Sequence, residues 1–174
     1  AVLEMGMSGR GEIELLTKIA VPDAAIITNI GEAHLLDLGS REGIADAKFE
    51  IVKGLKEGGA FIYDGDEPLL DERVKGHSLN KITFGSQADN TYVPVLIKQE
   101  NEGTYFTINK YPDTEIFMPI LGKHNVFNAL AGIAVGEYFN VSLENIQKGL
   151  TQLKVSNMRL EVTEGRNGSK IIND

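Results

Sequence analysis

The sequence predicts an α/β fold in which a mostly parallel sheet is flanked by helices and joined by a small antiparallel β subdomain. Three observations support this prediction. Apolar strand-like runs alternate with helical repeats over the first 63 residues, an order that is typical of parallel sheets. From about residue 81 to residue 119, short alternating segments are separated by turn residues, which is typical of antiparallel strands. Helical spacing then returns from Gly122 onward.

The first half of the chain predicts repeated strand–helix–strand steps. Short apolar runs predict strands at residues 1–5, 24–28 and 60–63. The first helix has apolar residues at helical spacing and ends before Pro22, because proline cannot continue a helix. The second helix begins after the N-cap candidate Ser40 and is expected to run to about residue 55.

The pattern in the second half of the sequence predicts an antiparallel meander, two helices and a hairpin. Alternating apolar and polar residues predict strands at residues 92–98, 104–109 and 115–118. Gly122 opens a helix that is expected to reach Phe139, and Ser142 caps another that ends near residue 153. A closing hairpin is expected from the segments 159–164 and 170–173.

The composition fits a folded domain and limits its partners. The 174 residues include no cysteine, which excludes a disulfide scaffold, a thiolate zinc site and a cysteine nucleophile. The 17 Lys and Arg residues against 25 Asp and Glu residues give a net charge of −8, which opposes binding to nucleic acid and to anionic membranes. No apolar run reaches the ~18 residues of a membrane span. We therefore expect no nucleic-acid partner and no membrane insertion.

Lys48 interrupts the apolar face of the predicted second helix. The apolar residues that share this face by spacing are Ile44, Ala47, Ile51, Val52 and Leu55. Burying an ammonium group costs free energy. The lysine therefore either extends its amine to water or becomes neutral and reactive, and its position alone leaves both alternatives open.

Glu4 and His34 are expected at the same edge of the sheet. Glu4 ends the first predicted strand, and His34 follows the strand that ends at residues 28–29. Ligands of open parallel sheets bind at the carboxyl ends of the strands, and a carboxylate there suits a hard cation such as Mg²⁺. The alternatives are a solvated strand-end glutamate and a surface histidine without a role.

Four further residues are candidates for binding a nucleotide. Asn125 and Asn128 share a face at the start of the predicted helix, and asparagine amides can pair with adenine N6 and N7. An N-cap and an incidental neighbour explain the two asparagines equally well. Arg159 is either a phosphate donor or a hairpin charge. Asp174 is the last residue, and its position predicts nothing by itself.

The glycine-rich segment at residues 6–11 does not match a phosphate-binding loop. It follows the first predicted strand, but it lacks the P-loop lysine and the spacing of the dinucleotide-binding motif. We interpret this segment as a turn. Motifs of zinc proteases and of serine hydrolases are also absent from the sequence.

Five segments, in order along the chain, resemble the Mur ligase family. They are residues 2–7, 27–35, 47–51, 122–129 and 158–161. The resemblance implies that residues 1–174 are a partial central ATPase domain, P-loop NTPase-like but without its first strand and phosphate loop. Residues 81–119 would be the antiparallel insertion. An N-terminal UDP-sugar domain and a C-terminal domain would lie outside this chain.

The resemblance also implies an activity. Within the family, the chain most resembles the members that add D-Ala-D-Ala to UDP-N-acetylmuramoyl-tripeptide, because residues 11–13 are Gly-Glu-Ile and Ala33 precedes His34. These enzymes are ATP-dependent amide ligases of peptidoglycan precursor synthesis, which takes place in the cytoplasm, and they proceed through an acyl phosphate. The implied cofactors are ATP and Mg²⁺.

The same resemblance gives roles to the candidate catalytic residues. Glu4 and His34 would hold Mg²⁺. Lys48 matches a lysine that is carbamylated in the family, which would make it a third, anionic ligand. These three residues are the implied catalytic and metal-binding set.

The resemblance assigns the nucleotide to four residues. Asn125 and Asn128 would contact the adenine of ATP, Arg159 would contact phosphate, and Asp174 would begin a segment that reaches the ribose. Asn157 replaces a glycine that is common in the family, which leaves the shape of the turn before Arg159 open.

Two other interpretations remain open. Folylpolyglutamate synthetases also combine a histidine loop with a Leu-Gly element and a lysine helix, as in residues 38–39 and 44–48. A non-catalytic nucleotide-binding or interaction module is the second alternative. If the chain is part of a ligase, we expect it to be inactive by itself, because the phosphate loop would lie upstream of Glu4. Lys48 is then expected to be unmodified when Mg²⁺ is absent.

Overall fold

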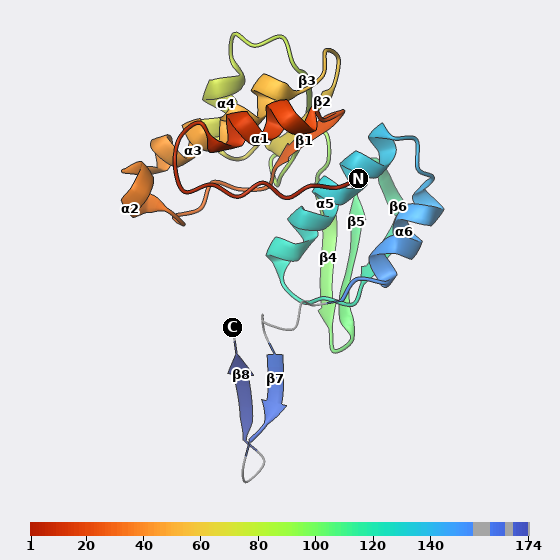
Figure 1. Cartoon of the computed structure of the whole chain (residues 1–174). Helices are drawn as coiled ribbons and strands as arrows, with labels where there is room; N and C mark the ends of the chain where they lie inside the picture. The colour runs from red at the N-terminus through yellow and green to blue at the C-terminus, as the bar shows by residue number, and fades with distance from the viewer. Residues whose placement is uncertain (155–160, 166–168, 174) are drawn as a thin grey trace.

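The computed structural model describes residues 1–154, 161–165 and 169–173 (Figure 1). The first half of the chain contains a parallel sheet. Its strands are β1 (Ala24–Ile27), β2 (Ala60–Asp64) and β3 (Asn80–Phe84), in the order β1-β2-β3. Both pairs of neighbours are parallel. The predicted class, a parallel sheet with flanking helices, is confirmed.

Helices cover both faces of this sheet because the side chains of β2 alternate between two cores. Phe61 and Tyr63 pack with the helices α1 (Glu12–Ala20), α3 (Arg41–Phe49) and α4 (Pro68–Val74). Ala60 and Ile62 lie in a second core with the helix α5 (Lys123–Tyr138). Strand residues two apart share a face, so every residue from Ala60 to Tyr63 is buried.

The antiparallel sheet shares the second core. Its strands are β4 (Pro94–Glu100), β5 (Gly103–Ile108) and β6 (Tyr111–Met118), followed after α5 by α6 (Leu143–Thr151). Phe106 and Ile116 of this sheet lie in the same core cluster as Leu130 of α5 and Ile62 of the parallel sheet. The antiparallel unit is therefore packed onto the rest of the chain through α5, and the described residues form no separate core within it.

The structure moves one predicted boundary. Residues 81–84, which the sequence pattern placed in the antiparallel unit, belong to β3 and pair with β2. Phe84 is buried in the core shared with α5, and the parallel pairing with β2, not the alternating pattern, determines the sheet to which these residues belong. The helix α4 was not predicted, and the strands β7 (Glu161–Glu164) and β8 (Lys170–Asn173) form the expected hairpin.

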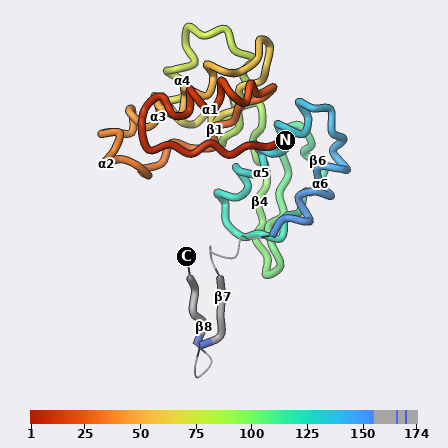
Figure 2. The backbone as a smooth tube through the Cα atoms, in the orientation of Figure 1, coloured from red at the N-terminus to blue at the C-terminus, as the bar shows by residue number. Residues whose placement is uncertain are grey.

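Residues 1–5 do not form the predicted strand. They run as an extended segment without ladder partners among the described residues (red in Figure 2). Val2 and Leu3 are 98% and 64% exposed. An apolar run becomes a strand only when a neighbouring strand accepts its backbone hydrogen bonds, and no strand among the described residues pairs with residues 1–5.

The predicted second helix is divided into two parts. Ser40 caps α3 as expected, since its hydroxyl accepts a hydrogen bond from Gly43 N at 3.1 Å. The α-helix ends at Phe49, and a 3₁₀ helix, η1 (Glu50–Gly54), continues to residue 54. The hydroxyl of Thr17 on α1 donates to Ile51 O at 2.8 Å. A Cβ atom on Gly54 would lie 2.4 Å from Thr17 O, so the two helices are in close contact there.

Glu50 joins the end of α3 to the start of α1. Its carboxylate accepts hydrogen bonds from Gly11 N at 2.8 Å and from Glu14 N at 3.2 Å. The first amides of a helix have no partners within the helix, and the helix dipole favours a negative charge near them. Glu50 therefore stabilises the first turn of α1 from a distant point in the sequence.

A hydrogen-bonded group of three side chains ties α5 to the antiparallel sheet. The Tyr92 hydroxyl and the Lys110 amine both donate to Glu137 Oε2, at 2.5 and 2.8 Å. Burial raises the pKa of Glu137, but the hydrogen bonds from Lys110 and Tyr92 lower it overall. Burial and the bond to Glu137 together raise the pKa of Tyr92 to about 12.

We expect the Glu137→Gln variant to lose about 1–3 kcal/mol of unfolding free energy, because two donors would lose a charged acceptor. The pKa of Glu137 is lowered in the folded chain from 4.5. The contribution of Glu137 to the unfolding free energy is therefore complete above pH 4.5, and it is lost as the pH falls through the lowered pKa of the folded chain. Urea unfolding at several pH values measures both effects.

Glu102→Gln is the control for the Glu137 experiment, because Glu102 accepts a hydrogen bond from the exposed hydroxyl of Tyr105 at 3.2 Å. Exposed pairs contribute little to stability. Equal losses in the two variants, or an unchanged acid dependence in Glu137→Gln, would contradict the role given to Glu137.

Candidate functional site

The loop after β1 is fixed to α3 through two backbone carbonyl groups. Lys48 Nζ donates to Asn29 O at 2.9 Å, and Arg41 Nη2 donates to Ile30 O at 3.0 Å. The side chain of Ile30 is only 4% exposed and lies in the core below α3. The loop that leads to His34 is therefore anchored at its first residues.

Lys48 combines features of both alternatives that its sequence position leaves open. Ile44, one helical turn before Lys48, and Ala47, directly before it, are both buried. Lys48 itself is partly buried. Its amine is bound to the Asn29 carbonyl oxygen. Burial lowers the pKa of Lys48, which is the direction that favours a neutral, nucleophilic amine.

His34 is exposed and sits where the loop turns into the short helix α2 (Leu35–Leu38). Its φ of 65° is in the left-handed region, which is uncommon for a residue with a Cβ atom. Its Nδ1 lies 3.5 Å from a carboxylate oxygen of Asp37. The imidazole is thus accessible from solvent.

Glu4 is also exposed, within the extended segment at residues 1–5. Across residues 1–154, 161–165 and 169–173, no three His, Cys, Asp or Glu side chains gather closely enough to hold a metal ion. Glu4 and His34 supply only two ligands of these types. Their role with Lys48 as a metal-binding set stays a prediction.

Glu12 is a residue of this region that sequence reasoning did not select. Its carboxylate accepts hydrogen bonds from Ser8 N at 2.6 Å and from Gly9 N at 3.2 Å. The bond from Ser8 is the largest cause of its lowered pKa, and the charge of His34 also contributes. Glu12 therefore orders the turn that follows residues 1–5. An acidic residue in the first helical turn was the available signal.

Asn125 and Asn128 lie together on the first turns of α5, as predicted. Asn125 is not the N-cap, which is Gly122. Its amide nitrogen donates to Leu121 O at 2.8 Å, and the amide nitrogen of Asn128 lies 3.5 Å from Asn125 Oδ1. The side chain of Asn128 is exposed. Arg159 and Asp174 lie outside the described residues, so their predicted contacts to phosphate and ribose stay predictions.

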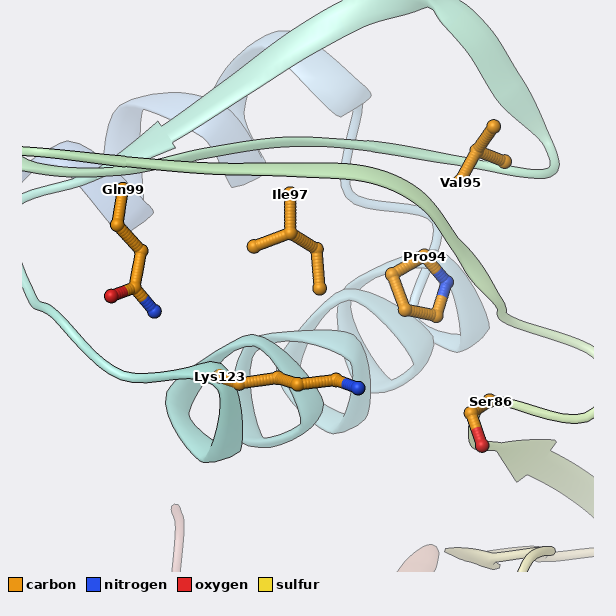
Figure 3. Close-up of a pocket in the computed structure, with 6 residues that line it drawn as sticks. All are labelled: Ser86, Pro94, Val95, Ile97, Gln99 and Lys123. Carbon is orange, nitrogen blue, oxygen red and sulfur yellow. The ribbon is translucent and has the colours of Figure 1, made fainter.

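A groove of about 460 Å³ lies between β4 and the N-terminal turn of α5 (Figure 3). Its lining residues are Ser86, Pro94, Val95, Ile97, Gln99 and Lys123. It presents one ammonium group and one amide beside apolar side chains, and Ser86 Oγ already donates to Asp66 at 2.6 Å. None of the predicted site residues that the structure describes lines this groove. In the described part of the chain, no helix is both long and apolar enough to cross a membrane.

Comparisons with known proteins converge on one family. The model of the Mur ligase middle domain matches residues 1–136. The UDP-N-acetylmuramoyl-tripeptide–D-alanyl-D-alanine ligase of Bacillus subtilis is 56% identical over 174 residues, which are the whole of this chain and 37% of that protein. The corresponding ligase of Escherichia coli is 35% identical over 164 residues, covering 92% of this chain and 36% of that protein.

Solved structures of the same enzyme have the same fold. A crystal structure of MurF from Acinetobacter baumannii has a TM-score of 0.89 and 31% identity, covering all of this chain and 38% of that one. MurF from Thermotoga maritima in complex with ADP has a TM-score of 0.83 and 28% identity, with 99% and 40% covered. An FPGS–AMPPCP complex has a TM-score of 0.75 at 19% identity and shows a shared fold alone. The chain spans little more than a third of the curated relatives it matches.

Proposed function

Because this chain belongs to the Mur ligase family, we propose that it supplies the middle, ATP-binding part of a ligase that adds D-Ala-D-Ala to UDP-N-acetylmuramoyl-tripeptide. The 56% identity to the Bacillus subtilis ligase over the whole chain supports this substrate pair. The structural observation that carries the chemistry is Lys48, which is partly buried, has a lowered pKa and is bound to the loop of His34.

The side chains fit a divalent cation only when Lys48 carries a carboxylate. An ammonium group repels a cation and has no free lone pair, whereas Mg²⁺ prefers anionic oxygen ligands. In carbamylation, the lone pair of the neutral amine attacks the carbon of CO₂. A C–N bond forms, one C=O bond becomes C–O⁻, and an amine proton passes to solvent. The lowered pKa of Lys48 favours the neutral amine that this step needs.

The proposed roles of the individual side chains rest on the family membership. Glu4, His34 and the carbamylated Lys48 would hold Mg²⁺, which supplies charge neutralisation for phosphoryl transfer when it is bound. Asn128, exposed beside Asn125 on α5, would pair with adenine. Asn125, which has one amide hydrogen bonded to Leu121 O, would contact the adenine as well.

The remaining proposals concern the nucleotide, the location and the extent of the domain. Arg159 would contact phosphate and Asp174 would begin the segment that reaches the ribose. We place the reaction in the cytoplasm. We also propose that this chain is a partial central domain, which depends on further domains for activity. These proposals rest on the same family membership.

We expect a chimera to add D-Ala-D-Ala. In this chimera, the present chain replaces the matching 174 residues of the Bacillus subtilis ligase. The expected result is ATP- and Mg²⁺-dependent phosphate release with UDP-N-acetylmuramoyl-tripeptide and D-Ala-D-Ala, and none with folate and glutamate. The product is identified by mass spectrometry, and circular dichroism checks that the chimera folds.

The controls separate the proposed function from its alternatives. A folded chimera that is inactive with D-Ala-D-Ala would contradict the proposal, and activity with folate and glutamate would favour a folylpolyglutamate synthetase. Binding of ATP by a folded chimera without any turnover would favour a non-catalytic module. The isolated 174-residue chain serves as the negative control, because we expect it to be inactive.

A further inference from the structure

We propose that Arg41 and Glu67 form a positioning clamp that keeps the His34 loop in place when Lys48 changes its chemical state. This inference rests on the proposed function, because it concerns the loop that carries a proposed metal ligand. Neither residue belongs to the candidate catalytic, metal-binding or nucleotide-binding set.

The clamp consists of a charged pair and one backbone carbonyl. Arg41 Nη2 donates to Ile30 O at 3.0 Å and to Glu67 Oε2 at 2.6 Å. The side chain of Glu67 is only 11% exposed, and its other oxygen, Oε1, accepts a hydrogen bond from Leu69 N at 3.2 Å at the start of α4. Charge-assisted hydrogen bonds of this kind are stronger than neutral ones. The loop is thus tied through α3 to the turn before α4.

The other anchor of the loop cannot survive the proposed chemistry unchanged. Lys48 holds Asn29 O as an ammonium donor. A carbamate keeps one N–H in place of three and places an anionic group beside the carbonyl oxygen, so the contact to Asn29 would be weakened. The contact from Arg41 to the next carbonyl does not depend on this change, because a guanidinium group stays charged.

The loop needs such an anchor because little else holds it. Residues 32–37 are all exposed, and His34 has a left-handed backbone conformation. Ile30 is the last buried residue before this stretch. Fixing its carbonyl therefore limits the range of positions that His34 can reach.

A second arginine offers a matched control. Arg73 on α4 donates to Asp46 Oδ1 on α3 through Nε at 2.9 Å and to Glu42 O at 2.8 Å. This pair also joins α3 to α4, but no hydrogen bond described for Arg73 reaches the loop at residues 28–34. A loss of general packing between α3 and α4 would affect both arginine variants, whereas loss of the clamp would affect only one.

The first test measures hydrogen exchange in the 174-residue chain itself. We expect Arg41→Met to speed exchange of the amides of Leu35, Asp37 and Leu38, which donate to the carbonyl oxygens of the loop residues Glu32 and His34, by about tenfold. Arg73→Met should leave the exchange rates of these three amides unchanged relative to the exchange rates of amides in β2. Glu67→Gln should have a smaller effect, since Arg41 can still donate to Ile30 O, and Arg41→Lys should restore part of the protection.

The second test uses the chimera with the Bacillus subtilis ligase. We expect Arg41→Met to raise the Mg²⁺ concentration for half-maximal activity about tenfold with a smaller change in kcat, and Arg73→Met to leave it unchanged. Equal loop exchange in the two arginine variants, or faster exchange throughout the chain, would overturn the clamp even if the chimera is active. If the chimera is folded but inactive, the proposed function fails while the exchange result still decides on the clamp.

Discussion

Replacing Lys48 with methionine reduces the ligase activity of the chimera by about 10²–10³-fold, the loss expected when one preorganised charged group is removed from a phosphoryl-transfer site. Methionine keeps the length and the apolar contacts of the side chain but cannot form a carbamate. The expected loss is mainly in kcat, with little change in the KM for D-Ala-D-Ala, because Lys48 is proposed to act on the transferred phosphate. Steady-state phosphate release measures both constants.

Lys53→Met is the control for the Lys48 variant. Lys53 lies on η1, which directly follows α3, and pairs with Glu14 through an exposed salt bridge. Its replacement removes a positive charge at a similar point of the fold without touching the His34 loop. Full activity in Lys48→Met would contradict the proposed carbamylation, and an equal loss in Lys53→Met would show that charge alone explains the effect.

The same proposal predicts how modification of Lys48 depends on pH. Only the neutral amine attacks CO₂, and the pKa of Lys48 is lowered by burial. Carbamylation should therefore increase as the pH rises and should begin at a lower pH than for an exposed lysine. Carbon-13 NMR with labelled bicarbonate detects the carbamate, and its signal should be absent in Lys48→Met.

Replacing Leu130 with alanine costs about 2–5 kcal/mol of unfolding free energy, the range for removing a large buried side chain. Leu130 is 0% exposed and belongs to the core that joins α5 to both sheets. The loss should affect both sheets in one transition, because the buried apolar residues of the antiparallel sheet belong to the same core as α5 and β2. Urea unfolding monitored by circular dichroism measures the loss.

Leu36→Ala provides the comparison for Leu130→Ala. Leu36 of α2 is fully exposed, so its truncation should change stability by less than about 0.5 kcal/mol. Two separate unfolding transitions in Leu130→Ala, with the parallel sheet unaffected, would contradict the shared core.

Periodicity was sufficient for the elements that bury a regular face. The helices α1, α5 and α6 begin and end near the predicted positions, because glycine or serine precedes each of them and an apolar stripe follows. The same reasoning placed Lys48 beside buried residues of α3. These features depend on local spacing, which the sequence contains directly.

Features that depend on distant partners could not be predicted in the same way. Residues 1–5 have the apolar composition of a strand but pair with no strand in the described part of the chain. Residues 81–84 resemble the alternating segments that follow them, and only their pairing with β2 places them in the parallel sheet. The contacts of Arg41 with Ile30 and Glu67 join three segments, and no local pattern marks them.

Lys48 and Glu50, near the end of α3, connect two separate loops to one short segment. Lys48 binds the backbone after β1, and Glu50, two residues later, binds the backbone at the start of α1. A rigid-body displacement of this segment would carry both attached loops by the same vector. The distance between the two loops is therefore preserved during such a motion, because the spacing of Lys48 and Glu50 along the segment sets it.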